Sequence, residues 1–384
     1  MKRKTHLCLL GDARIANLTP LLDKETAPEE VVLVFYPAQE AEREDFEQVL
    51  SRYGITIIHL PIPSPYNYAS TLQEIRKYLN ERNDTSIVLN ASGGTKAMTL
   101  AATDAFREKN LPIFYVEHEI DQLLWLQGGE GDFDLQDRIS LKNYLLAYGV
   151  EVESVVKASA VRKGLKKLTK DILKNIDGYG KALGTLNYLA NSPKKENGRY
   201  IVKLSSAQQK DENFNLLLQR IAREGVIEIQ EDSFIIADEE IRFFLNGGWL
   251  ETYFLGVIQE LKHELGIREV LQGLIVKKKG TDITNEIDIA FLHNNNLFLI
   301  ECKTSRFAQV EHDESPGSEM LYKLDTLGNV LGSCNGRMML ASYREISQYD
   351  IQRAKDLQIE ICVASELQEL SAKIKKWILN KKIE

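Results

Sequence analysis

Short apolar stretches alternate with helix-like segments along the first part of the chain. The apolar runs predict strands at residues 7–10, 31–36, 55–60, 86–89, 113–116 and 123–126. The segments between them predict helices at residues 17–22, 40–53, 69–79 and 96–109. Strands that alternate with helices indicate a parallel sheet covered on both faces, and we assign this α/β domain to residues 1–150.

A basic stretch opens the middle part of the chain, residues 151–245. Residues 155–181 carry eight lysines and arginines against two aspartates. These cations either contact phosphates or form a solvated helix face, and the pattern alone leaves both roles open.

The remainder of the middle part reads as a small winged-helix-like module. It predicts a helix, a polar loop, a second helix and two short strands, at residues 182–189, 191–199, 213–224, 226–230 and 233–236. A helix followed by a hairpin is typical of a winged helix, which binds DNA or serves as a dimerising connector. Because the second helix carries few cations, we favour the connector.

The third part, residues 246–384, predicts another α/β domain. It opens with Gly247-Gly248-Trp249-Leu250-Glu251 and a helix that we expect to run to residue 265. Strands are predicted at residues 270–277, 286–292, 297–303, 337–342 and 360–364. Helices are predicted at residues 319–330, 346–357 and 366–379. The fold class is therefore α/β in both outer domains.

Two neighbouring strands of this third domain carry carboxylates within apolar surroundings. Side chains alternate along a strand, and a four-residue turn at 293–296 would place Asp288 opposite Glu301 and Glu286 opposite Lys303. Facing carboxylates about 5 Å apart repel each other. A divalent cation with oxygen ligands would remove that repulsion, and Lys303 would then assist an attacking water. The alternative is an exposed polar sheet face with cross-strand ion pairs, which the flanking apolar residues disfavour.

Asp288, followed by twelve residues and then Glu301-Cys302-Lys303, resembles the core of PD-(D/E)XK nucleases, although no proline precedes Asp288. The resemblance implies that Asp288 and Glu301 hold Mg²⁺ or Mn²⁺, together with Glu251 from the first core helix. The alternative role for Glu251 is that of a helix N-terminal acid. By the same resemblance, Lys323 on the helix after the hairpin is a second-rank candidate for substrate or water contact, and Arg353 is a weaker one.

Polar loops follow three of the predicted N-terminal strands. The loop at 90–96 contains paired glycines and opens a helix, an arrangement that lets a ligand's phosphate approach the backbone. It matches neither a Walker A loop nor Gly-x-Gly-x-x-Gly. In a Rossmann-like sheet such loops converge on one crevice. The candidate ligand-binding residues are Gly11, Asp12, Asn17, Gln39, Ser92, Gly93, Gly94, Thr95 and Lys96.

Asn17-Leu18-x-Pro20-Leu21 and Ser92-Gly93-Gly94-Thr95-Lys96 are similar to a CARF domain over about residues 5–130. CARF domains are the Rossmann-like sensors of cyclic oligoadenylates in type III CRISPR systems. With a nuclease core at the C-terminus, the whole chain resembles the CRISPR ancillary nucleases. The resemblance implies a homodimer that binds cyclic tetra-adenylate and then cleaves nucleic acid. It does not indicate whether the substrate is DNA or RNA, or whether it is single-stranded or duplex.

Composition narrows these possibilities further. With 43% hydrophobic and 27% charged residues, the chain is not disordered, and no apolar run approaches the length of a membrane span. The four cysteines are scattered without a CxxC pair, so we expect neither a zinc site nor disulfides, and a cytoplasmic location. A net charge of −8 disfavours a large non-specific nucleic-acid surface, although not a local one.

Two rival functions remain at this stage. One is a restriction or repair nuclease outside CRISPR that carries a nucleotide-sensing domain. The other is a non-catalytic regulator with a CARF domain and a DNA-binding winged helix. If the protein is a nuclease, we expect the signal from the sensor domain to reach the nuclease domain through the middle segment or through dimer contacts.

Overall fold

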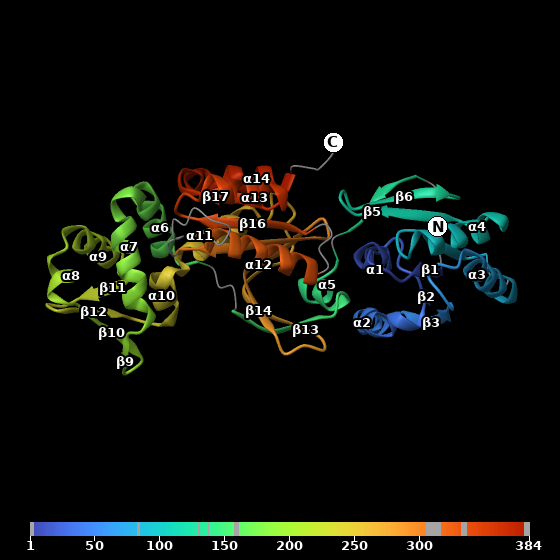
Figure 1. Cartoon of the computed structure of the whole chain (residues 1–384), viewed down its shortest axis with the longest axis horizontal. Helices are drawn as coiled ribbons and strands as arrows, with labels where there is room; N and C mark the ends of the chain where they lie inside the picture. The colour runs from blue at the N-terminus through green and yellow to red at the C-terminus, as the bar shows by residue number, and fades with distance from the viewer. Residues whose placement is uncertain are drawn as a thin grey trace.

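The computed structural model describes residues 4–82, 85–129, 131–136, 138–156, 161–304, 316–331 and 336–379. They form three units in a row (Figure 1), with the N-terminal unit at one end and the middle unit at the other. The C-terminal unit lies between them, so the order in space differs from the order along the chain.

The N-terminal unit is built on a seven-stranded sheet. Five parallel strands come first in spatial order, β3 (Thr56–Pro61), β2 (Glu30–Phe35), β1 (Thr5–Leu9), β4 (Ile87–Asn90) and β5 (Ile113–Glu117). The antiparallel strands β6 (Gln122–Gln127) and β7 (Phe133–Asp134) complete it. The predicted parallel sheet is confirmed.

Helices cover both faces of this sheet. Leu7 and Leu9 of β1 pack with α3 (Tyr68–Arg82) and α4 (Lys96–Glu108). Cys8 lies on the opposite face, which packs with α1 (Arg14–Leu22), α2 (Glu40–Leu50) and α5 (Leu141–Ala147). Successive side chains of each strand point to opposite faces of the sheet, and both faces are apolar and covered by helices. This is the Rossmann-like arrangement expected from the sequence.

The middle unit combines helices with a small antiparallel sheet. Its helices are α6 (Lys163–Lys174), α7 (Ile176–Asn191), α8 (Ser206–Lys210) and α9 (Glu212–Arg223). Its strands follow the order β11 (Ile227–Ile229), β12 (Ser233–Ile236), β10 (Arg199–Lys203) and β9 (Lys194–Glu196). The expected helix and hairpin are therefore present, as α9, β11 and β12.

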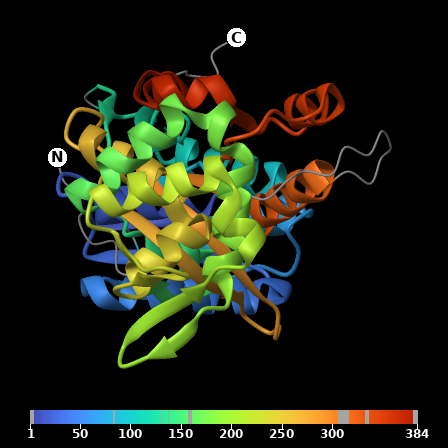
Figure 2. The same cartoon turned by 90° about the vertical axis from the view of Figure 1, so that its left-hand side faces the viewer.

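The prediction of a polar loop at 191–199 is wrong, because this stretch contains β9 and the start of β10. All residues of β9 are exposed, so the strand has no buried face to give it an apolar period. Figure 2, viewed from this end of the molecule, shows the β9–β10 hairpin projecting away from the rest of the unit.

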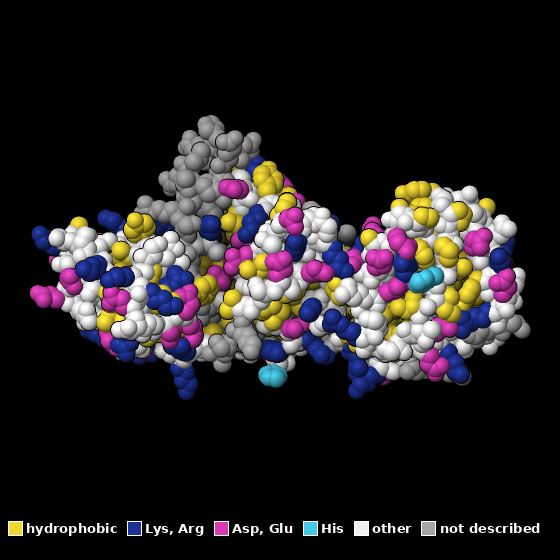
Figure 3. Space-filling model, turned by 90° about the horizontal axis from the view of Figure 1, so that it is seen from below, with side chains coloured by type: hydrophobic (Ala, Val, Ile, Leu, Met, Phe, Trp, Pro, Cys, Tyr) yellow, Lys and Arg dark blue, Asp and Glu magenta, His cyan; other side chains and the backbone are white. Residues whose placement is uncertain are grey.

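The basic stretch at 155–181 is not one helix. Its first two residues belong to β8 (Val150–Val156), Lys157 lies outside the described residues, and α6 and α7 follow. On α6, Lys166 pairs with Glu260 at 2.8 Å and Lys167 with Glu224 at 2.6 Å. Several of its cations therefore serve intramolecular ion pairs. The face shown in Figure 3 likewise has Lys and Arg interspersed with Asp and Glu.

The C-terminal unit is a mixed six-stranded sheet flanked by helices. Its strands follow the order β17 (Glu360–Val363), β16 (Arg337–Ser342), β15 (Asn296–Lys303), β14 (Thr284–His293), β13 (Val270–Lys278) and β8. The helical segments are α10 (Glu239–Phe243), η3 (Phe244–Gly248), α11 (Trp249–Leu261), α12 (Pro316–Val330), α13 (Gln348–Asp356), η4 (Ala364–Glu369) and α14 (Leu370–Leu379).

The N-terminal and C-terminal units also touch directly. One hydrophobic cluster contains Leu145 of α5 together with Leu274 of β13 and Leu292 of β14. Lys279 donates to Asp45 Oδ1 at 2.6 Å across the same boundary. The premise that the two outer units are joined only through the middle segment is therefore wrong, because a direct interface exists, and the route of the signal stays a prediction. None of the described helices is long and apolar enough to cross a membrane.

Candidate active site and ligand-binding loops

The β14–β15 hairpin has the predicted register but a tighter turn. Leu292 pairs with Leu297, as expected, and the ladder continues outward to the pair His293–Asn296. The turn therefore has two residues rather than four, Asn294 and Asn295, with φ values of 47° and 51°. Two consecutive positive φ angles are the requirement of a type I′ turn, and asparagine tolerates them well.

Asp288 is brought against the neighbouring strand by its side chain. The backbone ladder between β14 and β15 ends at Ile289–Ile300, one position before Asp288 would face Glu301. There the Cys302 main-chain N–H donates to Asp288 Oδ2 at 2.6 Å. The Asp288 carboxylate thus lies beside the Glu301-Cys302-Lys303 segment, in the neighbourhood that the sequence predicted.

Glu251 joins this group from α11. Gln272 of β13 donates to Glu251 Oε2 at 3.4 Å, and Gln272 itself pairs with Ile289, the residue after Asp288. Burial raises the pKa of Glu251, and the negative charge of Asp288 raises it further. This is the environment of a shared carboxylate cluster rather than of a solvated acid at a helix start.

The pKa of Asp288 is raised for the same reasons. Burial contributes most and the charge of Glu301 adds to it, whereas the hydrogen bond from Cys302 and the charge of Lys323 act in the opposite direction. Burial and neighbouring negative charges thus favour the neutral forms of both Glu251 and Asp288. Such an excess of negative charge in a folded protein is typical of a functional site.

The lysines of the candidate site differ in their contacts. Lys323 of α12 lies 2.8 Å from Glu301 Oε1, so the structure brings this second-rank candidate directly to the carboxylates. Lys303 ends β15 and is partly exposed. The guanidinium of Arg353 instead lies over the rings of Tyr322 and Tyr349, at 4.8 and 4.6 Å. Arg353 therefore belongs to an aromatic cluster on α12 and α13.

The donor chemistry of these residues fits a hard divalent cation. All three acidic side chains offer oxygen atoms, which Mg²⁺ and Mn²⁺ prefer. Within the part of the chain that the structure describes, no three His, Cys, Asp or Glu side chains gather closely enough to enclose an ion. Magnesium commonly takes one or two carboxylates and completes its shell with water and substrate oxygens, so the arrangement is compatible with it.

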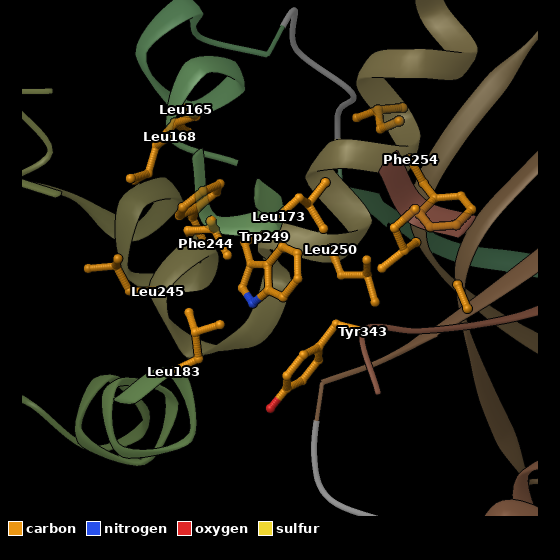
Figure 4. Packing of buried hydrophobic residues seen from close by; sticks show 14 of the residues in the cluster. Leu165, Leu168, Leu173, Leu183, Phe244, Leu245, Trp249, Leu250, Phe254 and Tyr343 are labelled. Atoms are coloured by element: carbon orange, nitrogen blue, oxygen red, sulfur yellow. The ribbon is translucent and has the colours of Figure 1, made fainter. Parts of the chain in front are cut away.

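A glycine kink positions Glu251. Gly247 has a φ of +105°, and a Cβ there would lie 2.3 Å from Thr304 Oγ1. Two residues after it, α11 begins with Trp249 and Leu250, which are both buried in the hydrophobic core. The ring centroids of Trp249 and Tyr343 are 5.7 Å apart (Figure 4). The start of α11 is therefore fixed against the carboxyl ends of β15 and β16.

Most of the candidate ligand-binding residues hold the N-terminal loops together. Asn17 Nδ2 donates to Leu9 O at 2.8 Å, and Gln39 Nε2 donates to Leu10 O at 3.1 Å. A Cβ at Gly93 would lie 2.1 Å from Leu9 O. These residues are thus required by the close approach of the loops at the end of β1, whether or not a ligand is bound.

The loop at 90–96 is fixed in a similar way. A Cβ on Gly11 would lie 2.8 Å from Gly94 N, so the two loops touch through their glycines. Ser92 Oγ donates to Asn90 Oδ1 at 2.6 Å and accepts from Val116 N at 2.8 Å. Thr95 caps α4 by accepting from Met98 N. Exposed candidates at this edge are Asp12 and Lys96.

Tyr66 is a residue at this edge that the sequence did not single out. Its side chain is 80% exposed, and Thr95 Oγ1 donates to the neighbouring Pro65 O at 2.5 Å. Tyr66 follows β3, whose carboxyl end lies at the same edge as those of β1 and β4. The signal that could have found it is therefore the strand-end rule applied to the third strand as well.

Comparison with known protein families identifies both outer units. A model of the Card1 CARF domain matches residues 5–144, and a model of the Card1-like endonuclease domain matches residues 238–381. A search of curated proteins found no significant match.

Solved structures extend the similarity over the whole chain. Protein VC1899 from Vibrio cholerae is 30% identical, with a TM-score of 0.88 and coverage of 97% of both chains. Can2 from Sulfobacillus thermosulfidooxidans, determined in complex with cyclic tetra-adenylate, is 27% identical, with a TM-score of 0.78 and coverage of 98% of this chain and 97% of its own.

A third structure, a type III CRISPR defence DNA nuclease activated by cyclic oligoadenylate, shares the fold alone. It is 17% identical, with a TM-score of 0.57, over 90% of this chain and 46% of its own. The order of domains, the paired family matches and the full-length similarity to VC1899 agree. The chain therefore belongs to the CRISPR ancillary nucleases that carry a Card1-type CARF domain and a Card1-like endonuclease domain.

Proposed function

We propose that the protein is a metal-dependent nuclease of type III CRISPR defence that cyclic oligoadenylate, specifically cyclic tetra-adenylate, switches on. The observation that carries the catalytic half is the set of Glu251, Asp288 and Glu301 within the Card1-like endonuclease domain, in which Glu301 is buried and desolvation raises the pKa of the other two acids. Their spacing relative to Lys303 is that of a PD-(D/E)XK core.

Each residue of this site has a distinct task in the proposed reaction. Asp288, Glu301 and Glu251 would hold Mg²⁺ or Mn²⁺, which supplies charge neutralisation at the scissile phosphate. Lys303 orients the attacking water and stabilises the negative charge that develops on the phosphate. Lys323 holds the Glu301 carboxylate through their 2.8 Å ion pair and is a positioning residue.

The CARF domain supplies the proposed switch. The similar protein Can2 has been determined with cyclic tetra-adenylate, and the match covers 98% of this chain. Here the carboxyl edge of the N-terminal sheet presents an exposed cation, Lys96, at the start of α4 and an exposed ring, Tyr66, on the adjacent loop. A cation suits a phosphate of the ligand, and a ring suits an adenine base.

A homodimer follows from the symmetry of the proposed ligand. A cyclic effector with an even number of nucleotides can contact two identical CARF domains equally across a two-fold axis. Leu100, one turn along α4 from Lys96, is 61% exposed and is available for such a contact. Size-exclusion chromatography with light scattering, with and without the effector, measures the oligomeric state.

Cleavage of labelled oligonucleotides tests the proposed function. Single-stranded DNA, duplex DNA and RNA are incubated with the purified protein, with or without cyclic tetra-adenylate and with Mg²⁺, Mn²⁺ or EDTA. We expect cleavage only with both effector and metal. Cleavage that ignores the effector would favour a nuclease outside CRISPR, and no cleavage of any substrate would favour the non-catalytic regulator.

A further inference from the structure

An open cavity of about 750 Å³ lies between the middle unit and the end of the catalytic sheet. It has walls from α7, α8, η3 and the segments that follow β15 and β16. The lining residues are Gly180, Lys181, Gly184, Thr185, Asn187, Tyr188, Asn191, Gln208, Asn246, Thr304, Tyr343 and Arg344. Its volume is within the range of pockets that bind small molecules or single nucleotides.

The cavity begins where the candidate active site ends. Thr304 lines it and directly follows Lys303, the last residue of β15. Lys303 is paired with Ser342 in the parallel β15–β16 ladder, and Tyr343, the next residue after Ser342, also lines the cavity. At about 3.3 Å per residue, Thr304 is roughly 10 Å beyond Glu301, so the cavity lies close to the carboxylates.

The charge of the lining suits a polyanion. None of the lining residues that the structure describes is acidic, although the whole chain has a net charge of −8. Arg344 donates to Gly180 O at 3.0 Å and to Tyr343 Oη at 2.7 Å, which fixes its guanidinium across the cavity wall. Two of its five N–H groups are used in these bonds, so the others remain to meet a phosphate. Lys181 is exposed on α7 nearby.

One wall of the cavity is shaped for a flat ring. Tyr188 of α7 lines it and is 78% exposed, so its ring is accessible to a ligand in the cavity. Gly180 and Gly184 leave the neighbouring helix surface bare, since a Cβ at either would meet nothing within 4 Å. Neither glycine is therefore needed for packing against the residues that the structure describes, and Gly184, about one turn before Tyr188, leaves room beside its ring.

We propose that this cavity is a substrate subsite that receives one unpaired nucleotide next to the scissile phosphate. Its base stacks on Tyr188, and its phosphate meets Arg344 and Lys181. The inference rests on the proposed nuclease function and assigns a binding role to the middle unit, which the family matches at 5–144 and 238–381 do not include. Stacking on a ring reads no sequence, so the subsite accepts either sugar and any base.

The test uses Gly184→Leu, which fills the cavity without straining the helix, because glycine is a poorer helix former than leucine. Gly178→Leu is the matched control, since Gly178 is also an exposed glycine of α7 with no atom near its Cβ but does not line the cavity. Each is combined with Glu301→Gln to prevent cleavage. Fluorescence anisotropy then measures binding of labelled dT20 and U20 with cyclic tetra-adenylate and Mg²⁺.

We expect Gly184→Leu to weaken binding of each of these oligonucleotides that the parent protein binds by roughly tenfold, and Gly178→Leu to leave it unchanged. Tyr188→Ala should weaken binding by about fivefold or more, and Tyr188→Phe should restore it, because the ring is retained. Melting temperatures of the variants should match that of the parent protein.

Several results would overturn the subsite. Unchanged binding in Gly184→Leu and Tyr188→Ala would do so, as would equal losses in Gly178→Leu or Tyr188→Phe. Absence of oligonucleotide binding by the Glu301→Gln protein would also overturn it. The proposed function is tested separately, by cleavage with the wild-type chain. If the Gly184→Leu protein cleaves and binds its substrate normally, the subsite proposal is rejected and the proposed nuclease function stands.

Discussion

Asn295, at the tip of the β14–β15 hairpin, donates a 2.7 Å hydrogen bond to Asp121 Oδ2 in the CARF domain, and both residues are buried. The adjacent Asn296 donates to His118 O at 3.0 Å in the same β5–β6 turn. Glu301 lies six residues farther along β15, roughly 20 Å away. One hairpin is therefore held by the CARF domain at its tip and carries proposed catalytic carboxylates at its other end.

The hydrogen bond between Asn295 and Asp121 predicts a direct route for activation. Asn295→Gly removes the side-chain amide but keeps the turn, because glycine accepts the positive φ of 51° at this position. We expect effector-stimulated cleavage to fall roughly fivefold or more, because the hairpin then loses a charge-assisted bond to the switch domain. Affinity for cyclic tetra-adenylate, measured by calorimetry, should change little.

Asn294→Gly is the matched control for that variant. It makes the same change one position earlier in the turn, where φ is 47°, and leaves the bond to Asp121 intact. Full activation is expected. Equal loss of activation in both variants would mean that turn stability matters rather than the contact, and normal activation of Asn295→Gly would remove this contact from the route.

The carboxylates predict a separable chemical defect. Glu301→Gln should lower the cleavage rate at least about 100-fold, because the amide cannot supply the charge that a metal ion requires. Effector binding should be intact, since the CARF loops are elsewhere. Glu286→Gln is the control, as Glu286 is an exposed acid on the neighbouring strand β14, two residues before Asp288. Wild-type cleavage by Glu301→Gln would reject the assignment.

Substitution of the exposed residues at the carboxyl edge of the CARF sheet should weaken effector binding without slowing the cleavage step itself. Lys96→Ala and Tyr66→Ala should each weaken cyclic tetra-adenylate binding by roughly tenfold, and saturating effector should restore cleavage. Lys109→Ala, at the other end of α4, is the control. Calorimetry measures the affinities, and unchanged values for both variants would place the ligand elsewhere.

Gly94 is a poor test of the same site. It has a φ of +78°, and a Cβ there would lie 2.8 Å from Leu9 Cβ. A bulky substitution would therefore disturb the loop even if no ligand ever touched it. The sequence pattern predicted that these glycines matter, but not that their first role is the packing of one loop on another.

Local periodicity explains why much of the fold could be predicted. The parallel N-terminal sheet and the pairing of Leu292 with Leu297 each follow from apolar patterns within a few residues. The position of β8 could not be predicted in this way. Its alternating residues 150–156 pair with β13, more than 100 residues later, and no local pattern names a partner at that distance.

Some residues of the candidate site could likewise be predicted from local sequence patterns, and others could not. Asp288, Glu301 and Lys303 lie on one hairpin, where spacing alone places them near each other. Lys323 and Gln272 reach the group through tertiary contacts, from α12 and β13. Gln272 interrupts an apolar strand, which was a usable signal. The direct contact between the CARF and endonuclease domains left no such signal in the sequence, because it depends on how the two domains pack.

The raised pKa values of Glu251 and Asp288 predict how stability depends on pH in the absence of metal. Their ordinary values are 4.5 and 3.8, and burial with like charges raises both in the folded chain. The folded state therefore holds these protons more tightly than the unfolded state does. This contribution to stability is complete below the ordinary values and is lost as pH rises through the raised ones.

A bound divalent cation should reverse this trend, because it binds the ionised carboxylates and stabilises the folded state at the pH where repulsion is greatest. We therefore expect the melting temperature in EDTA to fall from about pH 5 to about pH 8, and Mg²⁺ or Mn²⁺ to raise it more at the upper end. Glu251→Gln should flatten the decline in EDTA, since it removes one of the repelling charges. Differential scanning fluorimetry measures both effects. A decline of equal size in wild type and Glu251→Gln would show that the carboxylate group does not set it, and a metal effect independent of pH would place the ion away from these acids.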